Sequence, residues 1–134
     1  MNATLPTITA LYAALLGLLG TALTINVIVN RVRSKVDAGD GGVVKLAQAI
    51  RAHANFAEHA PIALIIIAFA EALGTRTVLV HIFGVALVLA RVASAVGLNR
   101  TLGQSPPRQF GASVTALVVI ASSIAVLFAI SGVR

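Results

Sequence analysis

Cysteine is absent from this chain of 134 residues, which excludes disulfides, zinc–thiolate sites and a catalytic protein thiol. Charged residues are also scarce, at 10% of the chain, and Trp does not occur. The net charge is +6, but no aromatic residues alternate with the basic ones as they do in many nucleic-acid-binding surfaces. We therefore expect no nucleic-acid partner, and any reactive thiol has to belong to a ligand.

Apolar residues, in contrast, make up 58% of the chain and gather in long runs. About 20 consecutive, mostly apolar residues are enough for a helix to cross a membrane. The runs and their flanks predict four spanning helices, at about 6–33, 44–73, 77–97 and 108–131. We expect residues 1–134 to form a single domain, an all-α integral membrane four-helix bundle.

Lys and Arg are divided unevenly between the two ends of the predicted helices. Six of them flank the loops at 34–43 and 98–107, whereas two, Arg76 and Arg134, belong to the opposite side. The positive-inside rule predicts that these two loops are cytoplasmic and that both termini lie outside. The first apolar run lacks the basic start of a signal peptide, because residues 1–30 contain no Lys or Arg, so we expect it to be retained.

Three polar residues recur on one side of the second predicted helix. Arg51, Asn55 and Glu58 are spaced i, i+4 and i+7 and form one stripe, with Gln48 and His59 at its edge. Charged groups at the centre of a membrane helix cost about 2.5–3.5 kcal/mol each, so such a stripe normally faces a bundle interior or a ligand. With a cation, an anion and a length of about 10 Å, it suits a small zwitterionic peptide. A polar ladder that joins helices would have the same spacing.

Two further arginines lie on the third and fourth predicted helices. Arg91 is expected either to pair with Glu58 or to face a ligand. Arg108 opens the fourth helix near the same end of the bundle. A cation there would favour the charged form of a bound thiol, and binding of a lipid phosphate is the alternative.

At the end of the first helix, Arg31 or Arg33 can reach a ligand carboxylate, while the other faces water or lipid headgroups. Glu71 lies opposite the stripe and is left outside the site. His53 and His59 do not have the spacing of metal ligands on a helix, so no metal site is expected.

Residues 51–61 resemble the second-helix signature of the membrane-associated proteins in eicosanoid and glutathione metabolism, the MAPEG family. That signature combines Arg, Asn, Glu and Pro at the spacing found here. The glycine-rich segment 39–42, Arg91 ahead of Gly97, and the segment 108–111 are similar to the bacterial branch of the family.

The resemblance implies a homotrimer of four-helix subunits in a bacterial inner membrane, with glutathione bound between adjacent subunits near the cytoplasmic side. It implies that Arg108 is the catalytic residue and stabilises the glutathione thiolate. The implied glutathione-binding residues are Arg31, Arg33, Gln48, Arg51, Asn55, Glu58, His59, Arg91 and Ser94. His59 and Ser94 depart from the family, which commonly has Tyr at the first position and an aromatic residue or His at the second.

The expected function is therefore that of a glutathione transferase or peroxidase. Glutathione would be the co-substrate, without a metal, and a lipophilic electrophile or lipid hydroperoxide would enter from the bilayer. One alternative is a small four-helix membrane transporter, although that class usually has an essential carboxylate in its first helix and no acidic residue precedes Asp37 here. The other is a non-catalytic membrane scaffold.

Overall fold

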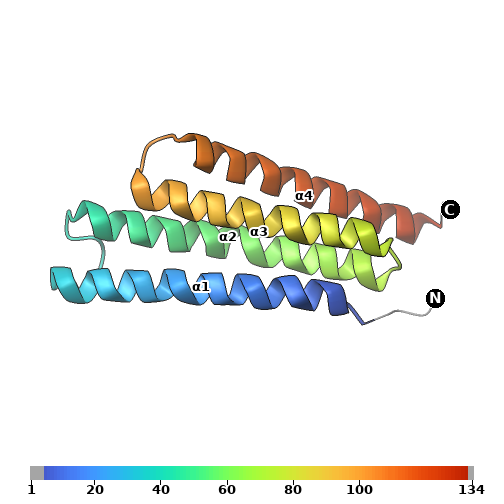
Figure 1. Cartoon of the computed structure of the whole chain (residues 1–134), viewed down its shortest axis with the longest axis horizontal. Helices are drawn as coiled ribbons and strands as arrows, with labels where there is room; N and C mark the ends of the chain where they lie inside the picture. Colours follow the sequence, from blue (N-terminus) through green and yellow to red (C-terminus); the bar gives the residue numbers. More distant parts are fainter. Residues whose placement is uncertain (1–4, 133–134) are drawn as a thin grey trace.

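The computed structural model describes residues 5–132, so Arg134 and the outermost ends of the expected domain lie outside the described residues. Its helices are α1 (Thr7–Ser34), α2 (Val44–Ala72), α3 (Thr77–Arg100) and α4 (Pro106–Ser131). They lie side by side and alternate in direction (Figure 1). Each is long and apolar enough to cross a membrane, and no strand occurs within 5–132. The expected all-α, membrane-spanning four-helix bundle is confirmed.

The middle of the bundle is formed by α2 and α3, which contact each other and both of the flanking helices. Within the described part of the chain, α1 and α4 make no contact with each other and lie on opposite flanks (Figure 1). The largest buried cluster joins all four helices through residues such as Leu16, Ile67, Leu87 and Val118. The outer surface is also apolar, as large exposed residues such as Leu18 and Leu117 illustrate, and this suits a surrounding lipid phase.

The third helix extends past Gly97, where we expected it to end, to Arg100. Gly97 is buried and serves a close approach between helices, because a Cβ there would come within 2.9 Å of the Arg108 backbone nitrogen. α4 begins slightly earlier than expected, at Pro106. Proline suits the first turn of a helix because the amide hydrogen it lacks would have no helical partner there.

At the end of the bundle that holds the start of α1, away from the loop between α3 and α4, polar side chains attach α1 to α2 and α3. The Glu71 carboxylate accepts hydrogen bonds from the Ile8 nitrogen at 2.8 Å, the Thr9 nitrogen at 2.7 Å and the Thr9 hydroxyl at 2.6 Å. Tyr12 and His81 are joined through the hydroxyl and Nδ1 at 2.7 Å. Glu71 thus satisfies amide groups that a helix start leaves without partners.

Candidate functional site

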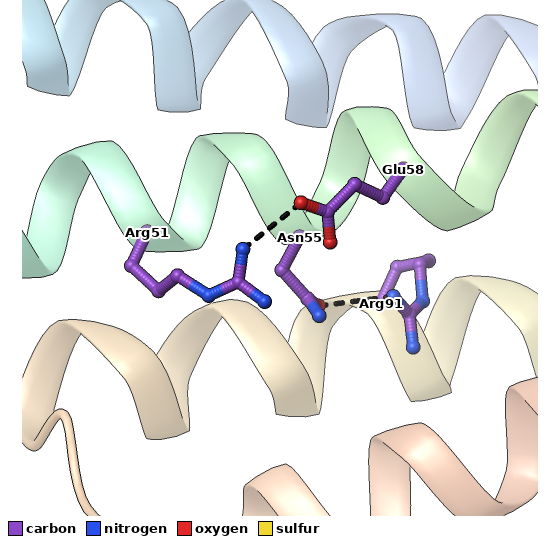
Figure 2. A network of polar contacts seen from close by, with 4 residues as sticks. All are labelled: Arg51, Asn55, Glu58 and Arg91. Carbon is purple, nitrogen blue, oxygen red and sulfur yellow. Dashed lines mark hydrogen bonds and ion pairs between the residues drawn. The ribbon is translucent and has the colours of Figure 1, made fainter.

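The polar stripe of α2 lies on one face of that helix, as its spacing predicts. Nη1 of Arg51 and Oε1 of Glu58 form an ion pair at 2.9 Å, and Asn55 lies between them (Figure 2). The two charged side chains remain 43% and 49% exposed on the surface of the single subunit. The structure therefore presents a cation, an amide and an anion together on an outward surface.

The depth of this stripe matters because α2 runs through the apolar part of the molecule. At a rise of 1.5 Å per residue, Arg51 lies about 10 Å and Glu58 about 21 Å from the first residue of α2. In hydrocarbon, exposed charges at such depths are costly unless another polar surface covers them. The stripe therefore needs polar cover at this depth in the membrane.

Arg91 is buried, with 1% of its surface exposed. Its Nη1 donates to Oδ1 of Asn55 at 3.2 Å (Figure 2). Its Nη2 donates to the Gly111 carbonyl oxygen at 2.9 Å, the Thr115 hydroxyl at 2.5 Å and the Ser94 hydroxyl at 3.2 Å. A single guanidinium thus joins α2, α3 and α4 beneath the stripe.

This geometry corrects one of the two expectations for Arg91. Arg91 does not pair with Glu58, because the Glu58 carboxylate turns along α2 toward Arg51. The Arg91 guanidinium instead bonds to Asn55 and to polar groups of α3 and α4. The charges of Arg51 and Glu58 therefore stay on the surface. Arg91 supports the stripe from inside the bundle through its bond to Asn55.

A groove of about 330 Å³ lies between α2 and α4, next to the stripe. Arg91 contributes to it, and its Nε is a buried donor without a partner in the described structure. The exposed ring of His59 and the Thr115 hydroxyl are the other polar groups among the lining residues. The lining residues are His59, Ile62, Arg91, Ala112, Thr115, Ala116, Val119 and Ile120. Most of the lining is apolar, so the groove can take an apolar molecule.

Gln48 and Ser94 are both buried instead of facing the outward surface. Gln48 donates through Nε2 to the Arg100 carbonyl oxygen at 3.1 Å, and its Oε1 has no partner in the described structure. Ser94 contacts Gly111, where a Cβ would collide with its hydroxyl. Both residues lie near the stripe but are directed toward α3 and α4.

Arg108 lies at the same depth in the bundle as Arg51. The antiparallel register of α2 and α3 sets Asn55 beside Arg91, so the residues near Gly97 lie beside Arg51. Gly97 in turn lies against the Arg108 backbone. Nη1 of Arg108 donates to the carbonyl oxygens of residues 102 and 103 at 2.9 and 3.1 Å. The side chain is therefore held by the loop that precedes α4.

Arg31 and Arg33 are at the same end of the molecule, on α1. Nη1 of Arg31 donates to the Gly39 carbonyl oxygen at 2.9 Å and to that of Val36 at 3.4 Å. Arg33 is exposed. No hydrogen bond of the described residues joins either of them to the stripe.

Gly111 and Thr115 bind Arg91 but were not among the contacts predicted for it. Their i, i+4 spacing places a small residue and a hydroxyl on one face of α4, which was a usable signal in an otherwise apolar run. Within residues 5–132, no three His, Asp or Glu side chains gather as metal ligands do.

Comparison with known proteins agrees with this architecture. The model of the MAPEG family matches residues 9–128. The curated relatives include "Inner membrane protein YecN" from Escherichia coli strain K12 and from Escherichia coli O6:H1 strain CFT073. Each is 38% identical over 95 residues, which cover 71% of this chain and 72% of the relative. The resemblance carried by the second helix is confirmed, and the chain belongs to the MAPEG family.

Proposed function

We propose that this chain is a glutathione-binding protein of the bacterial inner membrane that transfers the glutathione thiol to a lipophilic electrophile. The observation that carries the proposal is the half-exposed Arg51–Glu58 pair with Asn55 between its members (Figure 2). The family and the inner-membrane relatives support it.

The charges of glutathione are complementary to this surface. The tripeptide has two carboxylates and one ammonium group, and its length is similar to the distance covered by the stripe. Arg51 suits a carboxylate through two parallel hydrogen bonds, and Glu58 suits the ammonium group. Asn55 accepts from Arg91 through Oδ1, which leaves its Nδ2 to donate to a peptide carbonyl. The ligand would thus exchange the internal ion pair for two ion pairs of its own.

A homotrimer would supply the cover that the stripe needs in hydrocarbon. An adjacent subunit would bury the ion pair together with the ligand, so that each site lies between two copies of the chain. In this arrangement Arg33, which is exposed at the loop end of α1, is the better of the two α1 arginines for a ligand carboxylate. Arg31 already binds its own loop.

Arg108 is the proposed catalytic residue. Its backbone lies at the depth of Arg51, and its positive charge, once released from the carbonyl oxygens of residues 102 and 103, would stabilise the thiolate over the thiol. The thiolate sulfur would form a bond to the electrophilic carbon, and the leaving group or opened ring oxygen would take the electron pair. With a lipid hydroperoxide, the thiolate sulfur would form a bond to the terminal peroxide oxygen as the O–O bond breaks, which gives glutathione sulfenic acid and an alkoxide that takes a proton to become the alcohol. A second glutathione would then give the disulfide and water. The groove between α2 and α4 is the proposed place for the lipophilic partner.

The ultraviolet difference spectrum of the glutathione thiolate tests this proposal in detergent-purified protein. We expect a saturable signal in the wild type, a strong loss of binding in Arg51→Met, and retained binding with a weaker thiolate signal in Arg108→Gln. Arg76→Gln, at the far end of the bundle, is the matched control and should behave like the wild type.

The outcomes separate the alternatives. If no thiol binds and Arg51→Met instead breaks up the assembly, the protein is a scaffold. If proteoliposomes show proton-coupled efflux that Glu58→Gln abolishes, it is a transporter. An unchanged thiolate signal in Arg108→Gln would contradict the role of Arg108 alone.

A further inference from the structure

A second groove, of about 530 Å³, lies at the loop end of α1 and contains none of the stripe residues. One wall is apolar. Two basic side chains and one acidic side chain lie at the end nearest the loop between α1 and α2. Its lining residues are Ile28, Arg31, Val32, Lys35, Val36 and Asp37. Ile28 and Val32 are 54% and 73% exposed, so this wall faces outward from the subunit.

The position of this groove along α1 sets it at the boundary between hydrocarbon and headgroups. The helix has 28 residues. At 1.5 Å per residue this corresponds to about 42 Å, whereas the hydrocarbon core of a bilayer is about 30 Å thick. The last turns of α1 therefore extend into the headgroup region. With the excess of about 12 Å shared equally between the two ends, about four residues at the end of α1 lie beyond the hydrocarbon, which sets the boundary between Ile28 and Lys35.

The groove carries a net positive charge, and the side chains of Arg31 and Lys35 have hydrogen-bond donors available there. Arg31 is fixed by one nitrogen, Nη1, which donates to the carbonyl oxygens of Val36 and Gly39. Neither Arg31 nor Lys35 forms an ion pair with a carboxylate of the described residues, Asp37 included. Two cations against one anion leave the groove with a net charge of +1. Its guanidinium and ammonium groups are thus available to an anion.

Lys35 occupies a backbone conformation that normally belongs to glycine. Its φ of 55° and ψ of 42° lie in the left-handed region. Among the described residues, Lys35 is the only one other than glycine with a positive φ. Its nitrogen donates to the Val32 carbonyl oxygen, and the Val36 nitrogen donates to that of Arg31. This is the pattern of a Schellman cap, in which glycine is preferred. The cap occupies two carbonyl oxygens that would otherwise repel an anion at this helix end.

We propose that this groove binds an anionic phospholipid. The phosphate would contact Arg31 and Lys35, and an acyl chain would lie along Ile28 and Val32. A lipid is preferred over a free phosphate because the apolar wall is continuous with the basic end and lies on the membrane side of it. This inference is independent of the proposed glutathione site.

The test compares binding of phosphatidylglycerol and phosphatidylcholine to the full-length protein by native mass spectrometry. Lys35→Gly removes the ammonium group and keeps, or eases, the left-handed cap. Because a basic residue near an anionic membrane surface contributes about 1 kcal/mol, we expect the preference for phosphatidylglycerol to fall by about fivefold. The thermal midpoint should stay the same or rise, and glutathione binding, measured on the same sample, should not change.

Lys45→Gln is the matched control, because Lys45 is exposed at the same end of the bundle and does not line the groove. It should keep the wild-type lipid preference. An equal loss in Lys45→Gln would mean diffuse attraction to the whole basic end, and an unchanged Lys35→Gly would mean no site; either result overturns the proposal. Displacement of the lipid by glycerol phosphate would also overturn it, since the site would then recognise a soluble phosphate.

Discussion

At the scale of single residues, Arg51 and Arg91 show how one residue type can have two different tasks in the same bundle. Arg51 is half-exposed and pairs with Glu58, so its charge is available to a ligand. Arg91 is buried and bonds to groups on three helices. Replacing each of them should therefore affect different properties.

Arg91→Met should destabilise the fold by about 3 kcal/mol, because it removes the buried charged hydrogen bonds that the guanidinium donates to Asn55, Gly111 and Thr115 across three helices. Arg51→Met should cost less than about 1 kcal/mol, since exposed ion pairs contribute little. Denaturation of the two variants in detergent, followed by helical circular dichroism, measures the difference. Equal losses of stability would contradict the supporting role of Arg91.

At the scale of elements, close contact between α3 and α4 depends on Gly111. A Cβ at this position would collide with the Ser94 hydroxyl and with the Ala90 carbonyl oxygen. The carbonyl belongs to the backbone and cannot rotate away. The absence of a side chain therefore lets Arg91 of one helix bond to the backbone of the next.

Gly111→Ala should lower stability by about 1–3 kcal/mol, the usual cost of overpacking. Gly17→Ala is its control, because a Cβ at Gly17 meets nothing within 4 Å. Alanine is favoured over glycine inside a helix by about 1 kcal/mol, so the control should be neutral or stabilising. Thermal melts of both variants decide the question, and parallel behaviour would refute the close-contact argument.

The attachment of α1 to α2 gives a second prediction for the elements. Glu71→Ala removes the acceptor of three hydrogen bonds at the start of α1, at a cost of about 1.5–3 kcal/mol. Hydrogen exchange of the Ile8 and Thr9 amides should accelerate, whereas Thr9→Val, which removes only the hydroxyl bond, should have a smaller effect. Unaltered exchange in Glu71→Ala would show that the start of α1 is held by other contacts.

At the scale of the whole molecule, the uneven distribution of Lys and Arg predicts the orientation in the membrane. Because the chain has no Cys, a single introduced Cys can be labelled without background. Thr75→Cys, in the loop between α2 and α3, should react with a membrane-impermeant maleimide in intact spheroplasts. Ala38→Cys, in the loop between α1 and α2, should react only after permeabilisation. The reverse pattern would place both termini in the cytoplasm.

Much of the fold could be predicted from the sequence. Four spanning helices follow from the lengths of the apolar runs, because lipid requires each backbone polar group to be satisfied within its own helix. The spacing of Arg51, Asn55 and Glu58 likewise placed them on one face of α2, since local helical geometry is enough for that. The family signature rests on the same residues.

Only the tertiary structure decided which side chains of different helices bond to one another, because the spacing along one helix carries no information about its neighbours. Whether Glu58 would meet Arg51 or Arg91 depended on the depth of α3 and on its distance from α4, where the Gly111 carbonyl and Thr115 bind Arg91. The assignment of Glu71 to the start of α1 likewise depended on contacts between residues far apart in the chain. Periodicity determines the face on which a side chain lies, but its partner is set by how closely the neighbouring helices pack, and here small residues on α3 and α4 determine that distance.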